Sequence, residues 1–145
     1  ILSYYGFEYT QEEIDIRKTS NNPTIYLEDI ATVIIAITNN KYKAHMVRFW
    51  AKEQFDLYKR WIKEQIDNNK PILAAFKFYP SPTPEAFLDH YSVISGYDKN
   101  GLYILTTWRH DSKQYRTWEQ LLSDQGLSFF YKEEFPLFLA FDIYE

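Results

Sequence analysis

The chain has 145 residues, a net charge of -4 and no cysteine. A chain of this length buries about 68–70% of the surface that its unfolded form exposes, so we expect a single domain over residues 1–145 that needs no disulfide or metal for stability. Hydrophobic residues make up 46% of the sequence and charged residues 25%, which is the composition of an ordered protein. The lack of cysteine excludes disulfides, zinc sites built on thiolates and thiol chemistry from this polypeptide.

Several classes of partner receive no support from the sequence. The basic residues are scattered rather than clustered, so we do not expect nucleic acid as a partner. The longest apolar run, residues 31–38, is far shorter than the roughly 20 residues of a membrane helix, and we expect no membrane span. His45 and His110 have no partner at a metal-ligand spacing, so neither a metal nor another cofactor is expected. The chain opens with Ile1 rather than Met and shows no signal peptide, which indicates a trimmed or processed start.

The first 70 residues are predicted to be mainly helical. Residues 1–6 are typical of a last helical turn whose helix begins before Ile1, with Gly6 as a left-handed cap. Thr10 and Glu13 form a capping box that starts a short helix through Ile16. Apolar stripes at steps of three and four predict two further helices, over residues 25–38 and 53–68. The stripe residues are Leu27, Ile30, Ile34 and Ile37 in the first and Phe55, Tyr58, Ile62 and Ile66 in the second. Between these helices, residues 45–50 are either a short strand or an extended loop.

From residue 71 onward the pattern becomes that of strands. Runs rich in β-branched and aromatic residues predict strands over residues 72–78, 90–97, 102–106 and 135–144. A hairpin turn is predicted at residues 98–101, with Asn100 and Gly101 at positive φ. Gly96 inside a strand indicates a bend or a close backbone approach. Thr117 and Gln120 predict the cap of a helix through Leu122. A helical part over about residues 1–70 and a sheet part over about residues 71–145 indicate the α+β class.

Two motifs in the sheet part lie at a fixed spacing. The segment from Asp89 to Asp98 reads DHYSVISGYD, and Thr106-Thr107-Trp108 begins 16 residues after His90. The first motif resembles the catalytic-histidine strand of papain-like cysteine peptidases, in which a histidine opens a strand that runs into Gly-Tyr and a hairpin. The second is similar to the Asn-Ser-Trp that carries the histidine-orienting residue in papain, at the same offset.

The N-terminal residues extend this resemblance over nearly the whole chain. Tyr4-Tyr5-Gly6 and the following Thr10-Gln11-Glu12-Glu13-Ile14 resemble the stretch after the catalytic cysteine in the C39-like branch of these peptidases. That branch includes the bacteriocin leader peptidases, which cut after a double glycine. The family's cysteine and its oxyanion-hole glutamine precede the Tyr-Tyr-Gly segment. The nucleophile is therefore missing from this chain, which is expected to be inactive as it stands.

The resemblance implies a papain-like fold, with N-terminal helices packed on a C-terminal antiparallel sheet, and a peptide or protein as substrate. His90 takes the position of the catalytic histidine, in a groove between the helical and sheet halves. Thr106 takes the position of the orienting residue, which is normally Asn or Asp, and Trp108 that of the aromatic residue that shields the histidine from water. The other three tryptophans are interpreted as core or groove-wall residues rather than as a ligand-stacking set.

Three functions remain open at this point. The first is a C39-like cysteine peptidase whose nucleophile-bearing N-terminus is absent from the chain. The second is a pseudopeptidase that binds an extended peptide without cutting it. Thr106 favours the second, because a hydroxyl accepts a hydrogen bond from an imidazole N–H but supplies no charge to stabilise the imidazolium. The third is an unrelated α+β domain with a structural role.

Overall fold

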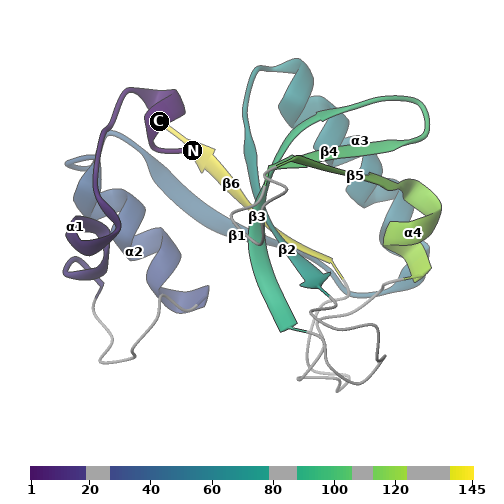
Figure 1. Ribbon diagram of the computed structural model, residues 1–145, viewed down its shortest axis with the longest axis horizontal. Coiled ribbons are helices and arrows are strands. Elements are labelled where there is room, and N and C mark those ends of the chain that lie inside the picture. Colours follow the sequence, from purple (N-terminus) through teal and green to yellow (C-terminus); the bar gives the residue numbers. More distant parts are fainter. Residues whose placement is uncertain (19–26, 79–87, 106–112, 124–137) are drawn as a thin grey trace. The chain divides into compact units, whose positions relative to one another are not determined.

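The computed structural model describes residues 1–18, 27–78, 88–105, 113–123 and 138–145, except for the side chains of residues 27, 28, 77, 78, 88–90 and 123 (Figure 1). Helices dominate the first half of the chain and strands the second, which confirms the α+β class. By their contacts the residues form two compact units. The first unit comprises Ile1–Met46 with Phe141–Glu145, and the second comprises Val47–Ala140.

The first unit holds three helical elements, η1 (Ser3–Tyr5), α1 (Gln11–Asp15) and α2 (Leu27–Ile37). Gly6 ends the first at φ 81°, the left-handed value predicted for it. At α1 the Thr10 hydroxyl accepts a hydrogen bond from the Glu13 N–H, and the Glu13 carboxylate accepts one from the Thr10 N–H. This is the predicted capping box. In α2 the described residues of the predicted stripe, Ile30, Ile34 and Ile37, are buried.

The remaining elements are a short 3-10 turn, two helices and six strands. They are β1 (Lys43–Phe49), η2 (Lys52–Gln54), α3 (Phe55–Asp67), β2 (Ile72–Phe78), β3 (Leu88–Tyr97), β4 (Gly101–Leu105), β5 (Lys113–Thr117), α4 (Trp118–Ser123) and β6 (Phe138–Tyr144). The strands form one sheet in the order β1-β6-β2-β3-β4-β5, and the neighbours from β2 to β5 pair antiparallel. The sequence left residues 45–50 open as a strand or a loop, and they belong to the strand β1 up to Phe49. Of the last predicted strand, residues 135–137 lie outside the described residues.

The core of the second unit lies between α3 and one face of the sheet (Figure 1). Tyr58 and Ile62 of α3 pack in a single buried cluster with residues of β2, β3 and β4. The sheet residues of this cluster are Ile72, Ala74, Phe76, Ile94, Leu102 and Ile104. Phe138 of β6 stacks on Tyr58 at a ring distance of 5.0 Å. The amphipathic stripe of α3 is therefore the residue set that holds the helix on the sheet. Among the tryptophans, Trp61 and Trp118 pack against this cluster as predicted. Trp50 is exposed, which excludes a core position and leaves a place in a groove wall as a prediction.

The β3–β4 turn differs from the sequence prediction in its backbone. Neither Asn100 nor Gly101 has a positive φ. The turn is instead held by the Asp98 carboxylate, which accepts hydrogen bonds from the N–H groups of both residues. Gly101 is needed for a different reason: a Cβ there would lie 2.1 Å from the Arg116 carbonyl oxygen on β5. The prediction failed because the constraint comes from a neighbouring strand rather than from the turn itself.

Gly96 marks an irregularity of β3, as expected. The pairing with β4 shifts by one residue between Ile94 and Gly96, which is a bulge at Ser95. A Cβ at Gly96 would meet only the Tyr103 side chain, at 3.6 Å. The bend is therefore confirmed at Gly96, and the close backbone approach is found at Gly101.

Candidate functional site

The candidate catalytic histidine lies near the start of an interior strand. The backbone of His90 is the third residue of β3, and its Cα partner on β2 is Phe76. The side chain of His90, and all of Thr106 and Trp108, lie outside the described residues. Of the three predicted site residues the structure thus places one backbone position. The roles of all three stay predictions.

The bulge in β3 brings the end of β4 nearer to His90 along the ladder. Beside the turn, Tyr97 pairs with Leu102, and an unbroken hairpin would continue this register to pair Leu105 with Ile94. Leu105 pairs instead with Val93. The last described residue of β4 is therefore one position closer to His90 than the turn alone would give.

A buried hydroxyl lies next to the histidine position on the same face of the strand. Ser92 follows His90 by two residues and pairs with Ala74 of β2. It is 3% exposed, and among the described residues its Oγ has no hydrogen-bond partner. The sequence alone did not single out this position. The available signal was a serine at a core-facing position of a strand, two residues before the buried Ile94.

The opposite end of β3 carries a cluster around Asp98. Beyond its two backbone donors, Asp98 accepts hydrogen bonds from the hydroxyls of Tyr115, at 2.8 Å, and Tyr103, at 3.3 Å. The bond from Tyr115 and those of the turn lower the pKa of Asp98. Partial burial and the bond to Asp98 raise the pKa of Tyr115 to about 12. Near neutral pH the carboxylate stays charged and the phenol neutral, so this cluster holds strands together and offers no acid or base for catalysis.

A shallow groove of about 390 Å³ lies between α4 and the segment that starts α3. Phe55, Trp118 and Leu122 supply its apolar lining, and the first two meet edge to face at a ring distance of 6.5 Å. Charged residues of both signs complete it: Lys52, Glu53, Asp56, Lys59 and Glu119. This lining suits an apolar side chain, but it contains no nucleophile.

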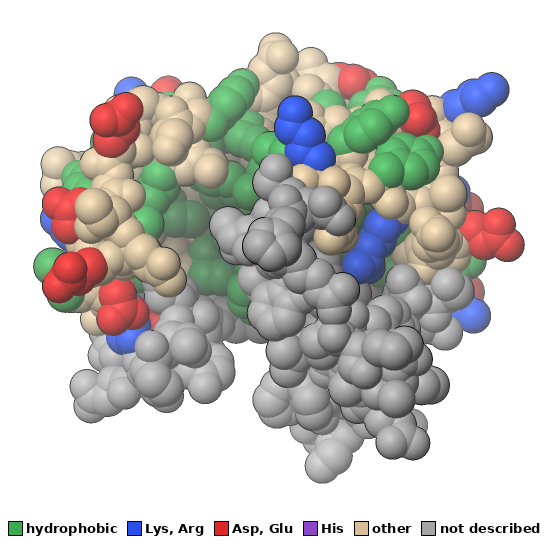
Figure 2. All heavy atoms as spheres, in the orientation of Figure 1, with side chains coloured by type: hydrophobic (Ala, Val, Ile, Leu, Met, Phe, Trp, Pro, Cys, Tyr) green, Lys and Arg blue, Asp and Glu red, His purple; other side chains and the backbone are tan. Residues whose placement is uncertain are grey.

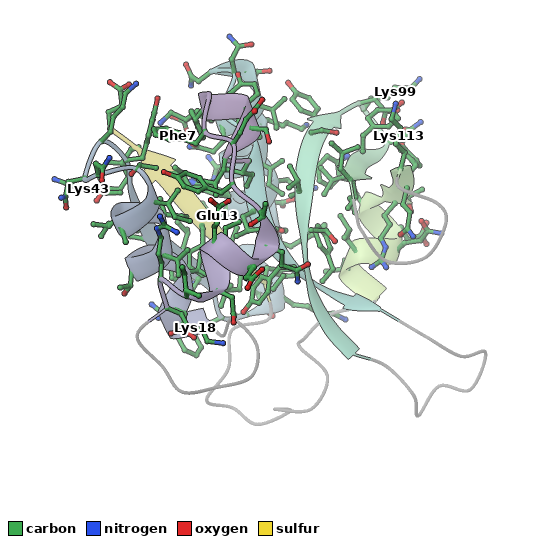
Figure 3. The ribbon with its side chains drawn as sticks, turned by 60° about the vertical axis from the view of Figure 1, so that its left-hand side comes forward. Phe7, Glu13, Lys18, Lys43, Lys99 and Lys113 are labelled. Carbon is green, nitrogen blue, oxygen red and sulfur yellow. The ribbon has the colours of Figure 1, made fainter. Side chains whose placement is uncertain are left out.

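The N-terminal segment of the first unit is anchored by aromatic contacts. The ring of Tyr5 lies 4.5 Å from that of Tyr42, and Phe7, labelled in Figure 3, meets the same ring edge to face. The stretch that resembles the one after the catalytic cysteine begins in this segment and continues to Ile14.

The described residues contain neither a metal-binding cluster nor a membrane-spanning helix. No three His, Asp or Glu side chains in this part of the chain gather as a metal ion would require. No helix within the same residues is both long and apolar enough to cross a membrane.

Comparison with known proteins gives one informative result. A family model described as the Peptidase_C39 like family matches residues 1–131. The match includes the N-terminal segment together with His90, Thr106 and Trp108. The comparison with curated proteins found no match, and neither did the comparison with solved structures. Because the matched range covers most of its length, the chain belongs to the Peptidase_C39 like family.

Proposed function

We propose that this chain forms the histidine-bearing part of a C39-like cysteine peptidase that hydrolyses peptide bonds. Membership of the family supports a peptidase-related function. The proposal of peptide-bond hydrolysis depends on one observation. The family match includes His90, whose backbone lies near the start of the interior strand β3. Such a position puts a histidine on a rigid element, which catalytic geometry requires.

In this proposal the three site residues have separate tasks. His90 takes the proton of a cysteine thiol, and its imidazolium stabilises the thiolate. Thr106 accepts a hydrogen bond from the other ring N–H and so favours one tautomer, without adding a charge. Trp108 covers the pair against water. The thiolate adds to the carbonyl carbon of the scissile bond, the leaving amine takes the proton from His90, and water then releases the acyl group from sulfur.

The proposal requires a thiol from outside these 145 residues, because they contain no cysteine. The test therefore uses protein expressed from the reading frame extended upstream of Ile1. Two histidine variants are compared, His90→Gln and His45→Gln. His45 is an exposed residue of β1 whose ring meets that of Tyr144 at 5.7 Å, so it serves as the matched control.

We expect His90→Gln to lower peptide hydrolysis by about 10²–10⁴-fold, the usual contribution of a general base. The same variant should slow alkylation of the thiol at about pH 6, because the imidazolium no longer favours the thiolate. His45→Gln should change neither rate. A reading frame without a cysteine before Ile1, or equal rates for the two variants, would exclude the peptidase.

A pseudopeptidase that binds an extended peptide is the second candidate. It is favoured by the threonine at position 106, where the family has Asn or Asp. Extended peptides are titrated into protein expressed from the reading frame extended upstream of Ile1, with tryptophan fluorescence reporting binding and mass spectrometry reporting cleavage. Saturable binding without cleavage products supports the second function. In an active enzyme, Thr106→Asn is expected to raise turnover, because an amide oxygen reaches farther than a hydroxyl. An unchanged rate would point to another orienting residue, such as Asp111.

A further inference from the structure

The strand β5 lies at one edge of the sheet. In the sheet order its one neighbour among the described strands is β4. The Trp118 N–H donates to the Asn100 carbonyl at 2.9 Å, which makes these two residues a hydrogen-bonded pair of the ladder. Since hydrogen-bonded pairs alternate along an antiparallel ladder, Arg116 and Gln114 also direct their backbone groups toward β4.

The other three residues of β5 direct their backbone groups away from β4. They are Lys113, Tyr115 and Thr117. One contact confirms this direction for Thr117. Its N–H donates a hydrogen bond to the Gln120 side-chain oxygen at 2.9 Å and so is not directed at β4. Within the described part of the chain, no backbone hydrogen bond is made by Lys113 or Tyr115 on this side. A row of unpaired donors and acceptors at a sheet edge is a template for another strand.

We propose that this edge pairs with β5 of a second copy of the chain, antiparallel and centred on Tyr115. In this register Tyr115 of one copy lies opposite Tyr115 of the other, and the two exchange both of their backbone hydrogen bonds. Lys113 lies opposite Thr117, so that the Lys113 N–H donates to the Thr117 carbonyl. About four backbone hydrogen bonds form in total, and the Thr117 N–H keeps its bond to Gln120.

The side chains of β5 are complementary to their own copies in this register. Gln114 lies opposite Arg116, and neither basic residue of the strand faces another. A shift by one residue would set Lys113 opposite Arg116 and would turn the outer face of one copy onto the inner face of the other. The sequence of the edge therefore selects a two-fold arrangement with both outer faces on one side.

The outer face of β4 and β5 adds an aromatic row to this arrangement. Tyr103 and Tyr115 lie opposite each other at a ring distance of 5.1 Å, and they are 47% and 39% exposed. Figure 2 shows hydrophobic side chains gathered over these two strands. The second copy would extend the pair to a row of four tyrosines. Five residues on each side bury far less than the roughly 1,600 Å² of a stable interface, so the dimer is weak. Half of the chains should be dimeric at about 0.1–1 mM.

Disulfide cross-linking tests the register directly. A hydrogen-bonded antiparallel pair sets its Cα atoms about 5.5 Å apart, which lies within the range of Cα separations found in disulfides. The chain has no cysteine of its own, so Tyr115→Cys introduces a single thiol. Lys99→Cys is the control, an exposed position in the β3–β4 turn that is labelled in Figure 3. We expect the Tyr115→Cys chain to form covalent dimers at least about tenfold faster than the control. Equal rates would overturn the proposal.

Sedimentation of the cysteine-free chain gives a second, independent measurement. The wild type should associate in a concentration-dependent way, and Tyr115→Lys should abolish the association by placing two lysines opposite each other. Tyr103→Lys is the matched control, because it removes a tyrosine from the same face but from the inner strand β4. It should leave the association in place, with circular dichroism verifying the fold of each variant. The proposal would be overturned by a wild type that stays monomeric at about 1 mM. It would also be overturned if the backbone amide signals of residues 113 and 115 changed on addition of an extended peptide but not with the concentration of the chain itself.

Discussion

The two faces of the strand β4 have opposite roles in the molecule. Leu102 and Ile104 are fully buried against α3, whereas Tyr103 and Leu105, on the other face of the same strand, are 47% and 39% exposed. Side chains that alternate along one strand thus meet either the densest part of the core or the solvent. The difference assigns most of the folding free energy to the inner face. On the outer face of β4, the Tyr103 hydroxyl donates a hydrogen bond to Asp98.

The largest change in stability is expected for a truncation on the inner face of β4, compared with a truncation of the next residue on the outer face. Ile104→Ala removes a buried side chain from the packed cluster, and the free energy of unfolding should fall by about 2–5 kcal/mol. Leu105→Ala removes a half-exposed side chain and should cost less than about 1 kcal/mol. Urea unfolding of the two variants measures both values. Similar losses would contradict the assignment of stability to the inner face.

The next effect separates the two glycines of the hairpin. Gly101→Ala places a Cβ against the Arg116 carbonyl, so the strands β4 and β5 must move apart, at a cost of about 1–3 kcal/mol. Gly96→Ala meets only the Tyr103 ring at an ordinary contact distance and should cost less than about 1 kcal/mol. Thermal unfolding of both variants tests the order. A greater loss at Gly96 would restore the sequence-based expectation that the close approach lies there.

Much of the secondary structure could be predicted because its signals are local. The stripe of α3, the capping box at Thr10 and the strands β2 and β3 depend on residues within a few positions of one another. The side-chain turn at Asp98, the bulge at Ser95 and the need for glycine at position 101 depend on contacts between strands. Periodicity within one strand carries no information on how closely the next strand approaches.

The candidate site was predictable only through the resemblance to C39-like peptidases. His90, Thr106 and Trp108 are single residues without a local pattern, and their spacing gains meaning from the family alone. The buried hydroxyl of Ser92 depends on which face of β3 meets the core, which alternation could have indicated once the strand was assigned. The edge of β5 required the sheet order, which no pattern in the sequence supplies.

A smaller effect is expected on the inner face itself, at the hydroxyl of Ser92. Ser92→Ala removes a buried group that has no hydrogen-bond partner within the described part of the chain, so the free energy of unfolding should stay equal or rise by up to about 1 kcal/mol. Ser95→Ala, at the exposed bulge, is the control and should change it by less than about 0.5 kcal/mol. Chemical unfolding of both variants decides the question. A loss of more than about 1 kcal/mol at Ser92 would reveal a hydrogen bond, for instance to a buried water.

The smallest effect belongs to the outer face, where Asp98 ties the turn to Tyr115 and Tyr103. Hydrogen bonds to the carboxylate lower the pKa of Asp98 in the folded chain below its ordinary value of 3.8. A group with a lowered folded pKa adds stability above its unfolded pKa and loses it as the pH falls through the folded pKa. The advantage of the wild type over Asp98→Asn should therefore be constant above about pH 5 and shrink below about pH 4.

Urea unfolding across this range measures the difference, with Glu64→Gln on the exposed surface of α3 as the control. Because Asp98 is only partly buried, solvent screens the interaction, and the change stays smaller than those on the inner face. A difference between the two chains that does not vary between about pH 2 and pH 6 would show that the pKa of Asp98 is the same in the folded and unfolded chain, which would contradict the prediction.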